Sequence, residues 1–253
     1  MCDTCGCTLT EGNSRHAHAL KTRAGADTVE VLTGLLDLND RQAAHNRSHF
    51  DTHGVLAINL MSSPGAGKTR LLESTIRALG DELRIAVVEG DLETENDAER
   101  IRSCGVPAVQ ISTGTACHLD AHLVHDALHE LELDGIDVLF IENVGNLVCP
   151  ASFDLGQHLN VTLLSTTEGD DKPAKYPVMF RRSDLVLLTK TDLLAALEGE
   201  FDPARAETAV RALGTAAPVL QVCARNTDGL APWSQWLRGQ LARRAAASLP
   251  ETG

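Results

Sequence analysis

Short apolar runs alternate with helix-like periodic segments along most of this chain. The runs are mostly continuous rather than alternating in polarity, which is typical of parallel strands buried on both faces of a sheet. We predict strands at residues 55–61, 84–89, 107–112, 137–143, 160–167, 184–190 and 217–223. Apolar positions at helical spacing predict helices at 68–79, 94–103, 116–131, 203–213 and 231–246, and one or two more within 28–50.

These elements predict an α/β fold, in which a doubly wound, mostly parallel sheet of about seven strands carries helices on both faces. Residues 1–26 lack periodicity and contain several Gly, Thr and His, so we expect a flexible N-terminal tail. One domain is expected over residues 27–250. Ligands of such a fold bind at the carboxyl ends of the strands, so candidate chemistry is sought there.

The composition and charge of the chain exclude some classes of function. The 253 residues are 43% hydrophobic, which is enough for a packed core, and 22 basic against 35 acidic residues give a net charge of −13. Such an acidic chain is a poor candidate for binding nucleic acid or an anionic membrane. No apolar run approaches the ~20 residues of a membrane span, and the N-terminus lacks a signal-peptide core. We therefore expect a cytoplasmic protein whose seven cysteines are reduced thiols.

Residues 55–70, VLAINLMSSPGAGKTR, combine a strand, a loop of small residues and the start of a helix, as in a phosphate-binding loop. Lys68 can reach the β and γ phosphates of a nucleotide, and the Thr69 hydroxyl can bind Mg²⁺. The opening Gly of the motif is Ser62 here. A chance Gly/Ser turn is the alternative, which the flanking strand and helix argue against. The predicted phosphate-binding residues are Ser63, Gly65, Ala66, Gly67, Lys68 and Thr69.

A second motif, Thr189-Lys190-Thr191-Asp192, follows another predicted strand and resembles the [NT]-K-x-D element of GTPases. The Asp192 carboxylate can accept hydrogen bonds from N1–H and the 2-amino group of guanine, and adenine offers neither donor. A polar turn with Asp as a helix N-cap is the alternative. The segment around Ala224 is expected to contact the base. We predict GTP contacts at Thr189, Lys190, Asp192 and Ala224.

Two acidic residues end other strands. Asp91 and Glu142 are predicted to hold Mg²⁺ directly or through water. Glu142-Asn143-Val144-Gly145 resembles the D-x-x-G element, and the N–H of Gly145 could sense the γ-phosphate. Together with Lys68 and Thr69 these residues predict in-line attack of water on GTP. No Gln or Arg identifies itself as orienting that water, so slow turnover is expected.

The N-terminal segment MCDTCGC suggests metal binding. Cys2, Cys5 and Cys7 with a fourth nitrogen or oxygen donor can chelate a thiophilic divalent ion, and square-planar coordination would suit Ni²⁺. The alternatives are an incidental Cys-rich tail or a zinc knuckle that lacks its fourth ligand.

A second candidate metal site lies inside the domain. Cys117 and His118 are predicted to open the helix at 116–131, and Cys149 follows the Glu142 strand, so a metal there could respond to the nucleotide. Further histidines continue from His118 at helical spacing. The role of His122 is undecided, and a solvated helix face is expected for His125 and His129. Four histidines elsewhere give no usable signal: His45, His49, His53 and His158.

The chain resembles the hydrogenase-maturation nickel-incorporation GTPases (HypB family). The resemblance rests on MCDTCGC, INLMSSPGAGKT, VVEGDLETENDAERI, GTACHLDAHLV, LFIENVGNLVCPASFDLG, STTEGDDKPAKYP and LLTKTDLL. It implies a GTPase that helps load nickel into [NiFe]-hydrogenase, acting on the large-subunit precursor with a small HypA-like metallochaperone. It also implies tight Ni²⁺ binding by the N-terminal cysteines and a GTP- and metal-dependent homodimer. A Ni²⁺ or Zn²⁺ site at the dimer interface would map onto Cys117, His118 and Cys149.

Two other functions stay open. A urease-accessory nickel GTPase is related, but its Cys-Pro-His element is replaced here by Cys149-Pro150-Ala151. A nickel-buffering protein with vestigial GTPase activity is the alternative from a different class, and the intact Lys68 and Asp192 argue against it.

Overall fold

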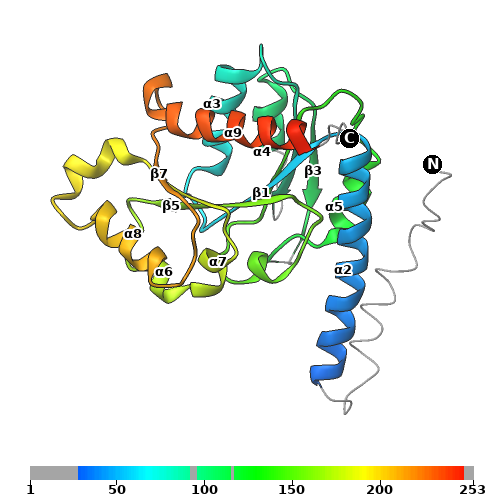
Figure 1. The fold of residues 1–253 in the computed structure, drawn as a ribbon, viewed down its shortest axis with the longest axis horizontal. Helices are drawn as coiled ribbons and strands as arrows, with labels where there is room; N and C mark the ends of the chain where they lie inside the picture. Colours follow the sequence, from blue (N-terminus) through cyan, green and yellow to red (C-terminus); the bar gives the residue numbers. More distant parts are fainter. Residues whose placement is uncertain (1–27, 92–95, 115–116, 248–253) are drawn as a thin grey trace, which may run out of the picture.

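The computed structural model describes residues 28–91, 96–114 and 117–247. Its centre is a sheet of seven parallel strands in the order β3-β2-β4-β1-β5-β6-β7 (Figure 1). The strands are β1 (Leu56–Ser62), β2 (Ile85–Asp91), β3 (Ala108–Ser112), β4 (Val138–Glu142), β5 (Leu159–Ser165), β6 (Leu185–Thr189) and β7 (Val219–Gln221). The predicted fold class is confirmed.

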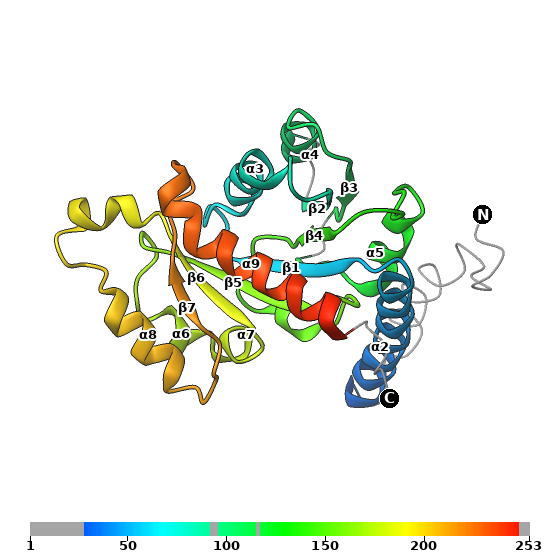
Figure 2. The same ribbon diagram turned by 45° about the horizontal axis from the view of Figure 1, so that its top comes forward.

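Helices cover both faces of this sheet, as Figure 2 shows from a second direction. They are α2 (Thr28–Thr52), α3 (Lys68–Leu79), α4 (Asn96–Arg102), α5 (Ala121–Leu128), α6 (Lys172–Lys175), α7 (Pro177–Arg181), α8 (Pro203–Arg211) and α9 (Thr227–Ala247), with short 3₁₀ helices η1 (Cys149–Ser152) and η2 (Thr191–Leu197). None of the described helices is long and apolar enough to cross a membrane.

Alternate residues of each strand face opposite layers, which explains the continuous apolar runs. On one face, Ile58 and Leu60 of β1 pack in a core with Ile76 of α3 and Trp233 of α9. On the other face, Ala57 of β1 lies in a core with Phe50 of α2 and Val124 and Leu128 of α5, while α7 and α8 cover the sheet beyond β5. Both faces are therefore dry, as a parallel sheet requires.

Strand β1 lies between β4 and β5, with β2 and β3 further out on one side and β6 and β7 on the other. The carboxyl ends of β1, β2, β4 and β6 all meet at one edge because the strands are parallel. This edge receives the phosphate-binding loop, the Glu142 segment and the Thr189-Lys190 segment, which are far apart in the sequence.

The sequence-based predictions of helix boundaries were partly wrong. The expected helix at 116–131 is shorter, since α5 begins at Ala121, where the Asp120 side chain caps it by accepting a hydrogen bond from the N–H of Leu123 at 2.9 Å. Cys117 and His118 therefore lie in the loop before the helix. The segment at 28–50 forms one long helix, and the short helices α6 and α7, each with Pro in its first turn, were not anticipated.

Candidate functional site

The loop between β1 and α3 has the backbone of a phosphate cradle. Gly65 and Gly67 adopt the left-handed region, with φ of 75° and 99°, which other residues reach only with strain. Gly67 then caps α3. The Lys68 Nζ donates to the hydroxyl of Ser62 at 3.1 Å, so the Ser that replaces the first Gly of the motif holds the lysine across the loop. The N-terminus of α3 faces the same space, which favours an anion there.

A hollow of about 390 Å³ opens beside this loop and contains several carboxylates. The Thr69 hydroxyl lies 3.0 Å from Oε1 of Glu142 and 3.2 Å from Oδ2 of Asp97. Lys68 Nζ lies 3.8 Å from Glu142, and both side chains are more than nine-tenths buried. Glu89 of β2 also lines the hollow.

The paired glutamates at the bottom of the hollow are electrostatically costly. Burial, reinforced by the neighbouring Glu142, raises the pKa of Glu89 to about 11. Burial also raises the pKa of Glu142, against the opposing attraction of Lys68. Glu89 Oε1 and Glu142 Oε2 are buried without a hydrogen-bond partner among the described residues. Together with the Thr69 hydroxyl, these oxygens form an oxygen-rich donor set that fits Mg²⁺.

Glu89 and Asp97 were missed by the sequence reasoning, which chose Asp91. The main chain of Asp91 ends β2, while its side chain lies outside what the structure describes. A signal was available, because residues two apart on a strand share a face and Glu89 is the acidic residue two before Asp91.

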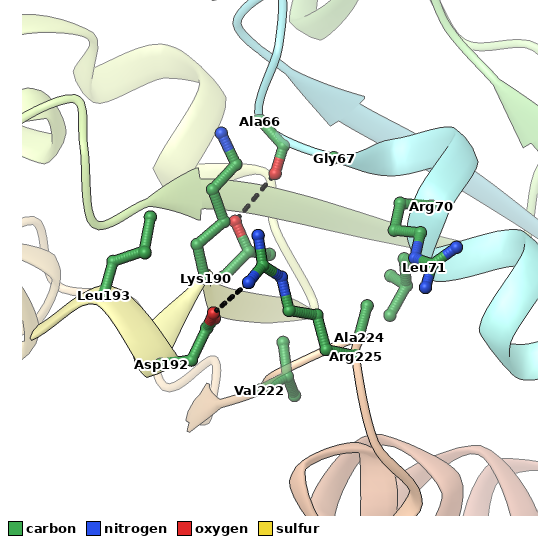
Figure 3. Close-up of a pocket in the computed structure, with 11 residues that line it drawn as sticks. Ala66, Gly67, Arg70, Leu71, Lys190, Asp192, Leu193, Val222, Ala224 and Arg225 are labelled. Carbon is green, nitrogen blue, oxygen red and sulfur yellow. Dashed lines mark hydrogen bonds and ion pairs between the residues drawn. The ribbon is translucent and has the colours of Figure 1, made fainter.

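A second cavity, of about 410 Å³, adjoins the first at Gly67 and Arg70 (Figure 3). The Thr189 hydroxyl donates to the carbonyl of Ala66 at 2.7 Å, and Lys190 Nζ donates to the carbonyl of Gly65 at 2.8 Å. The end of β6 is thereby tied to the phosphate-binding loop. Lys190 has a φ of 58°, a strained conformation for a residue with a side chain, and such strain gathers at functional sites.

Asp192 lies at the far end of this cavity. Its carboxylate lies 3.4 Å from Nη1 of Arg225, which reaches across the pocket in Figure 3, and 3.5 Å from Sγ of Cys223. The Ala224 carbonyl is held by the hydroxyl of Ser74 at 2.7 Å. The predicted residues Thr189, Lys190, Asp192 and Ala224 all line this one cavity.

Gly145 brings the loop after β4 onto the phosphate-binding loop. A Cβ added to Gly145 would lie 2.8 Å from Cα of Pro64, so only glycine permits this approach. The next residues lead to Cys149 at the start of η1. The structure thus brings the Gly145 segment and the phosphate-binding loop into direct contact.

The inner candidate metal ligands also come together. The ligand atoms of Cys117, His118 and Cys149 all lie within 4.8 Å of one another, with 3.0 Å between the two Sγ atoms and 3.6 Å from Cys117 Sγ to His118 Nδ1. The hydrogen bond with Cys149, then burial, raises the pKa of the Cys117 thiol. Burial lowers the pKa of His118, whose ring stacks on Phe153 with 4.0 Å between centroids. Thiols and a neutral imidazole suit a thiophilic divalent ion.

One expectation about histidines is wrong. His125 was expected on a solvated face but is buried between α5 and α2, where burial and then the neighbouring histidines lower its pKa to about 4. Cys104 and Cys223 were both expected to be small buried residues; Cys223 is buried, whereas Cys104 is only half-buried. The tail ligands Cys2, Cys5 and Cys7 lie outside the described residues.

Most of the chain is similar to known proteins. The family profile described as "CobW/HypB/UreG, nucleotide-binding domain" matches residues 56–221. The hydrogenase maturation factor HypB of Azotobacter chroococcum mcd 1 is 50% identical over 222 residues, which cover 87% of this chain and 72% of that protein.

Two solved structures share the fold. A crystal structure of HypB from Helicobacter pylori in complex with nickel has a TM-score of 0.77 at 39% identity, covering 81% of this chain and 95% of that chain. The hydrogenase maturation factor HypB of Archaeoglobus fulgidus has a TM-score of 0.75 at 38% identity, covering 81% of this chain and all of that one.

Proposed function

The chain belongs to the HypB proteins of the CobW/HypB/UreG nucleotide-binding family, and from this premise we propose that it is a GTP-hydrolysing metallochaperone that helps insert Ni²⁺ into [NiFe]-hydrogenase. One observation carries the proposal. Two adjoining cavities lie at the carboxyl edge of the sheet, and Asp192 lines one of them. Glu142 lines the other, and the loop after Glu142 leads to the cluster of Cys117, His118 and Cys149. This arrangement suits a protein in which a nucleotide controls a metal.

Guanine is the base that Asp192 selects. The Asp192 carboxylate accepts hydrogen bonds from N1–H and the 2-amino group of guanine. Arg225, now 3.4 Å from this carboxylate, must move away when the base enters. The guanidinium is exposed, so this exchange costs little. The stem of Lys190 lies along the base while its Nζ stays on the Gly65 carbonyl. Adenine would leave the carboxylate without a partner.

The phosphates occupy the cradle between Gly65 and Thr69. Lys68 stabilises negative charge that develops on the β and γ phosphates as an in-line water attacks. Thr69 and Glu142, with Glu89 and Asp97 nearby, would hold Mg²⁺, whose bound charge neutralises the phosphate oxygens. Glu142 and Lys68 are already arranged for this, because their side chains are buried and 3.8 Å apart.

Cys117, His118 and Cys149 are proposed to hold Ni²⁺ or Zn²⁺ as cargo, at an interface between two copies of the chain. A symmetric dimer would bring both copies of the cluster to its two-fold axis. Val148, beside Cys149, is 59% exposed, which leaves an apolar side chain available for such an interface.

A buried amide offers the route between nucleotide and metal. The Asn143 Oδ1 accepts hydrogen bonds from the N–H of Leu119 at 3.1 Å and of Val144 at 3.0 Å, so one side chain joins the loop after Cys117-His118 to the loop after Glu142. Asn146 Nδ2 donates to the Cys117 carbonyl at 3.2 Å. A movement of the Gly145 segment on γ-phosphate binding would therefore move metal ligands.

The proposed partners follow from the family. They are a HypA-like metallochaperone, the large-subunit precursor of a [NiFe]-hydrogenase and a second copy of this chain. Because thiols must be deprotonated and unoxidised to bind metal, we place the protein in the reducing cytoplasm.

Changing Cys2, Cys5 and Cys7 to Ser should abolish the tightest nickel site and leave GTP hydrolysis within a few-fold. A terminal segment can contribute ligands without contributing to packing of the nucleotide site. Nickel titration, read by the thiolate-to-metal absorption band, tests the first part, and phosphate release from GTP with Mg²⁺ tests the second. Tight binding that survives in the variant would mean that the tail cysteines are incidental.

The same assay separates the proposed function from nickel buffering. A full-length chain that turns over GTP but not ATP supports the proposal. Nickel binding without GTP turnover would leave a nickel-buffering protein with a vestigial nucleotide site.

A further inference from the structure

Four histidines lie together between α2 and α5, outside the linings of the two nucleotide cavities and outside the Cys117 cluster. His45 and His49 are one turn apart on α2, and His125 and His129 are one turn apart at the end of α5. Figures 1 and 2 both show these two helices side by side. None of the four has a role in the proposed GTPase.

The two helices are held in a fixed relation. Asn39 accepts from the N–H of Ala121 at 2.9 Å, and Asn46 Nδ2 donates to the carbonyl of Ala121 at 2.8 Å. Both asparagines are on α2 and buried. Side chains that project from α2 and α5 one or two turns further along are therefore presented to each other on a rigid frame, as a preorganised site requires.

Two imidazoles already stand at the spacing of metal ligands. Nε2 of His125 and Nε2 of His129 are 3.3 Å apart. Bonds of about 2.0–2.1 Å to a tetrahedral Zn²⁺ place neighbouring ligand nitrogens about 3.3 Å apart. Histidines at positions i and i+4 of a helix are also the pair that binds zinc in helical metalloprotease motifs.

A third imidazole stands edge-on to this pair. The His45 ring lies with its centroid 5.0 Å from that of His125, at an interplanar angle of 80°. Among the described residues, Nδ1 of His45 and Nδ1 of His125 are buried without a hydrogen-bond partner. Buried polar atoms are normally satisfied, so these two nitrogens are a second, independent sign that a ligand belongs here.

We propose that His125 and His129, joined by His45 after a rotation of its side chain, bind a divalent transition-metal ion such as Zn²⁺ or Ni²⁺ between α2 and α5. Imidazole nitrogen is a ligand that both ions accept. The site contains no thiolate, which distinguishes it from the cysteine sites of the proposed function, and it does not rest on that function.

The surroundings favour the metal-binding form of the rings. Burial, and after it the neighbouring histidines, lowers the pKa of His125 to about 4, which favours the neutral imidazole that binds metal at this position. His53 has a partner of its own, since its Nδ1 lies 2.7 Å from Oδ1 of Asp134. His129 is exposed while His125 is buried, so an ion can enter from the solvent side.

The test uses the full-length chain with Cys2, Cys5, Cys7, Cys117 and Cys149 changed to Ser, which removes the thiolate sites. Zn²⁺ is titrated in competition with a chromophoric chelator, and bound zinc is counted by elemental analysis. We expect this parent protein to bind an equivalent of zinc that depends on the histidine cluster. Adding His129→Gln to the parent should weaken the zinc affinity at least ~100-fold, because losing even an outer-shell partner of a metal ligand typically costs 10–100-fold in affinity.

His53→Gln is the matched control, because it removes a neighbouring histidine outside the proposed ligand set and should change the affinity less than three-fold, far below the per-ligand effect. His129 is exposed, so its variant should fold, and an unchanged thermal melt without zinc verifies this. Zinc should raise the melting temperature of the parent through this equivalent, and not that of the His129→Gln variant. A parent that binds no zinc would overturn the proposal. Equal zinc binding by the parent and the His129→Gln variant would also overturn it and would assign the bound zinc to other histidines.

Discussion

GTP binding should fall at least ~100-fold when Asp192 is replaced by Asn, because two base donors would then face an amide that offers one acceptor and an unwanted donor. The pocket supports this magnitude. Asp192 lines the same cavity as Ala66 and Lys190, and its carboxylate partners there are the exposed Arg225 and the thiol of Cys223. Equilibrium binding of a fluorescent GTP analogue measures the effect.

The same variant should gain affinity for xanthosine triphosphate, whose base carries an acceptor in place of the guanine amine. This gain separates base recognition from general damage, since an unfolded pocket would lose both nucleotides. Arg225→Ala is a useful companion, because it removes the neighbouring cation and keeps the carboxylate. GTP affinity that is unchanged in the Asp192→Asn protein would remove Asp192 from the base site.

Lys68→Ala should lower the rate of GTP hydrolysis by about 100- to 1,000-fold, the usual effect of removing one donor that stabilises transition-state charge. Lys68 is 7% exposed and lies between the Ser62 hydroxyl and the Glu142 carboxylate. Its loss would remove a cation that binds the phosphates and leave the Glu142 carboxylate facing them, so Mg²⁺–GTP affinity should fall as well.

Phosphate release under single-turnover conditions measures this prediction. Lys175→Ala is the matched control, because Lys175 is exposed, paired with Asp171 and outside the lining of both cavities, and its rate should equal that of the parent chain. A Lys68→Ala protein that hydrolyses GTP at the parent rate would show that the β1–α3 loop is not the catalytic phosphate site.

The fold could be predicted because its signal is local. Continuous apolar runs such as RIAVVE and DLVLLTK mark strands buried on both faces, and the strands found at Ile85–Asp91 and Leu185–Thr189 lie within two residues of the predicted ends. The start of α5 was misplaced because periodicity continues through the loop before it. Asp120, an N-cap residue, was the available signal for the start of the helix.

The candidate site was predictable where a motif encodes backbone shape, and less so where tertiary packing decides. Gly65, Gly67 and Lys68 are specified by the loop they form. Glu89 was missed because a buried carboxylate in an apolar strand looks like an isolated polar residue until β4 pairs beside it. The burial of His125 depends on how α2 crosses α5, which no short pattern in either helix reveals.

The central claim is that nucleotide and inner metal act on one another through the segment from Glu142 to Cys149. Linkage requires that a metal whose affinity depends on the nucleotide must shift the nucleotide or dimer equilibrium by the same factor. Sedimentation velocity of the full chain in GTP or GDP, each with and without Ni²⁺, measures this directly. We expect Ni²⁺ to alter the GTP-dependent dimerisation, and Cys117→Ala, His118→Ala or Cys149→Ala to erase that response while Mg²⁺–GTP still binds. Identical association in all four conditions would contradict the account.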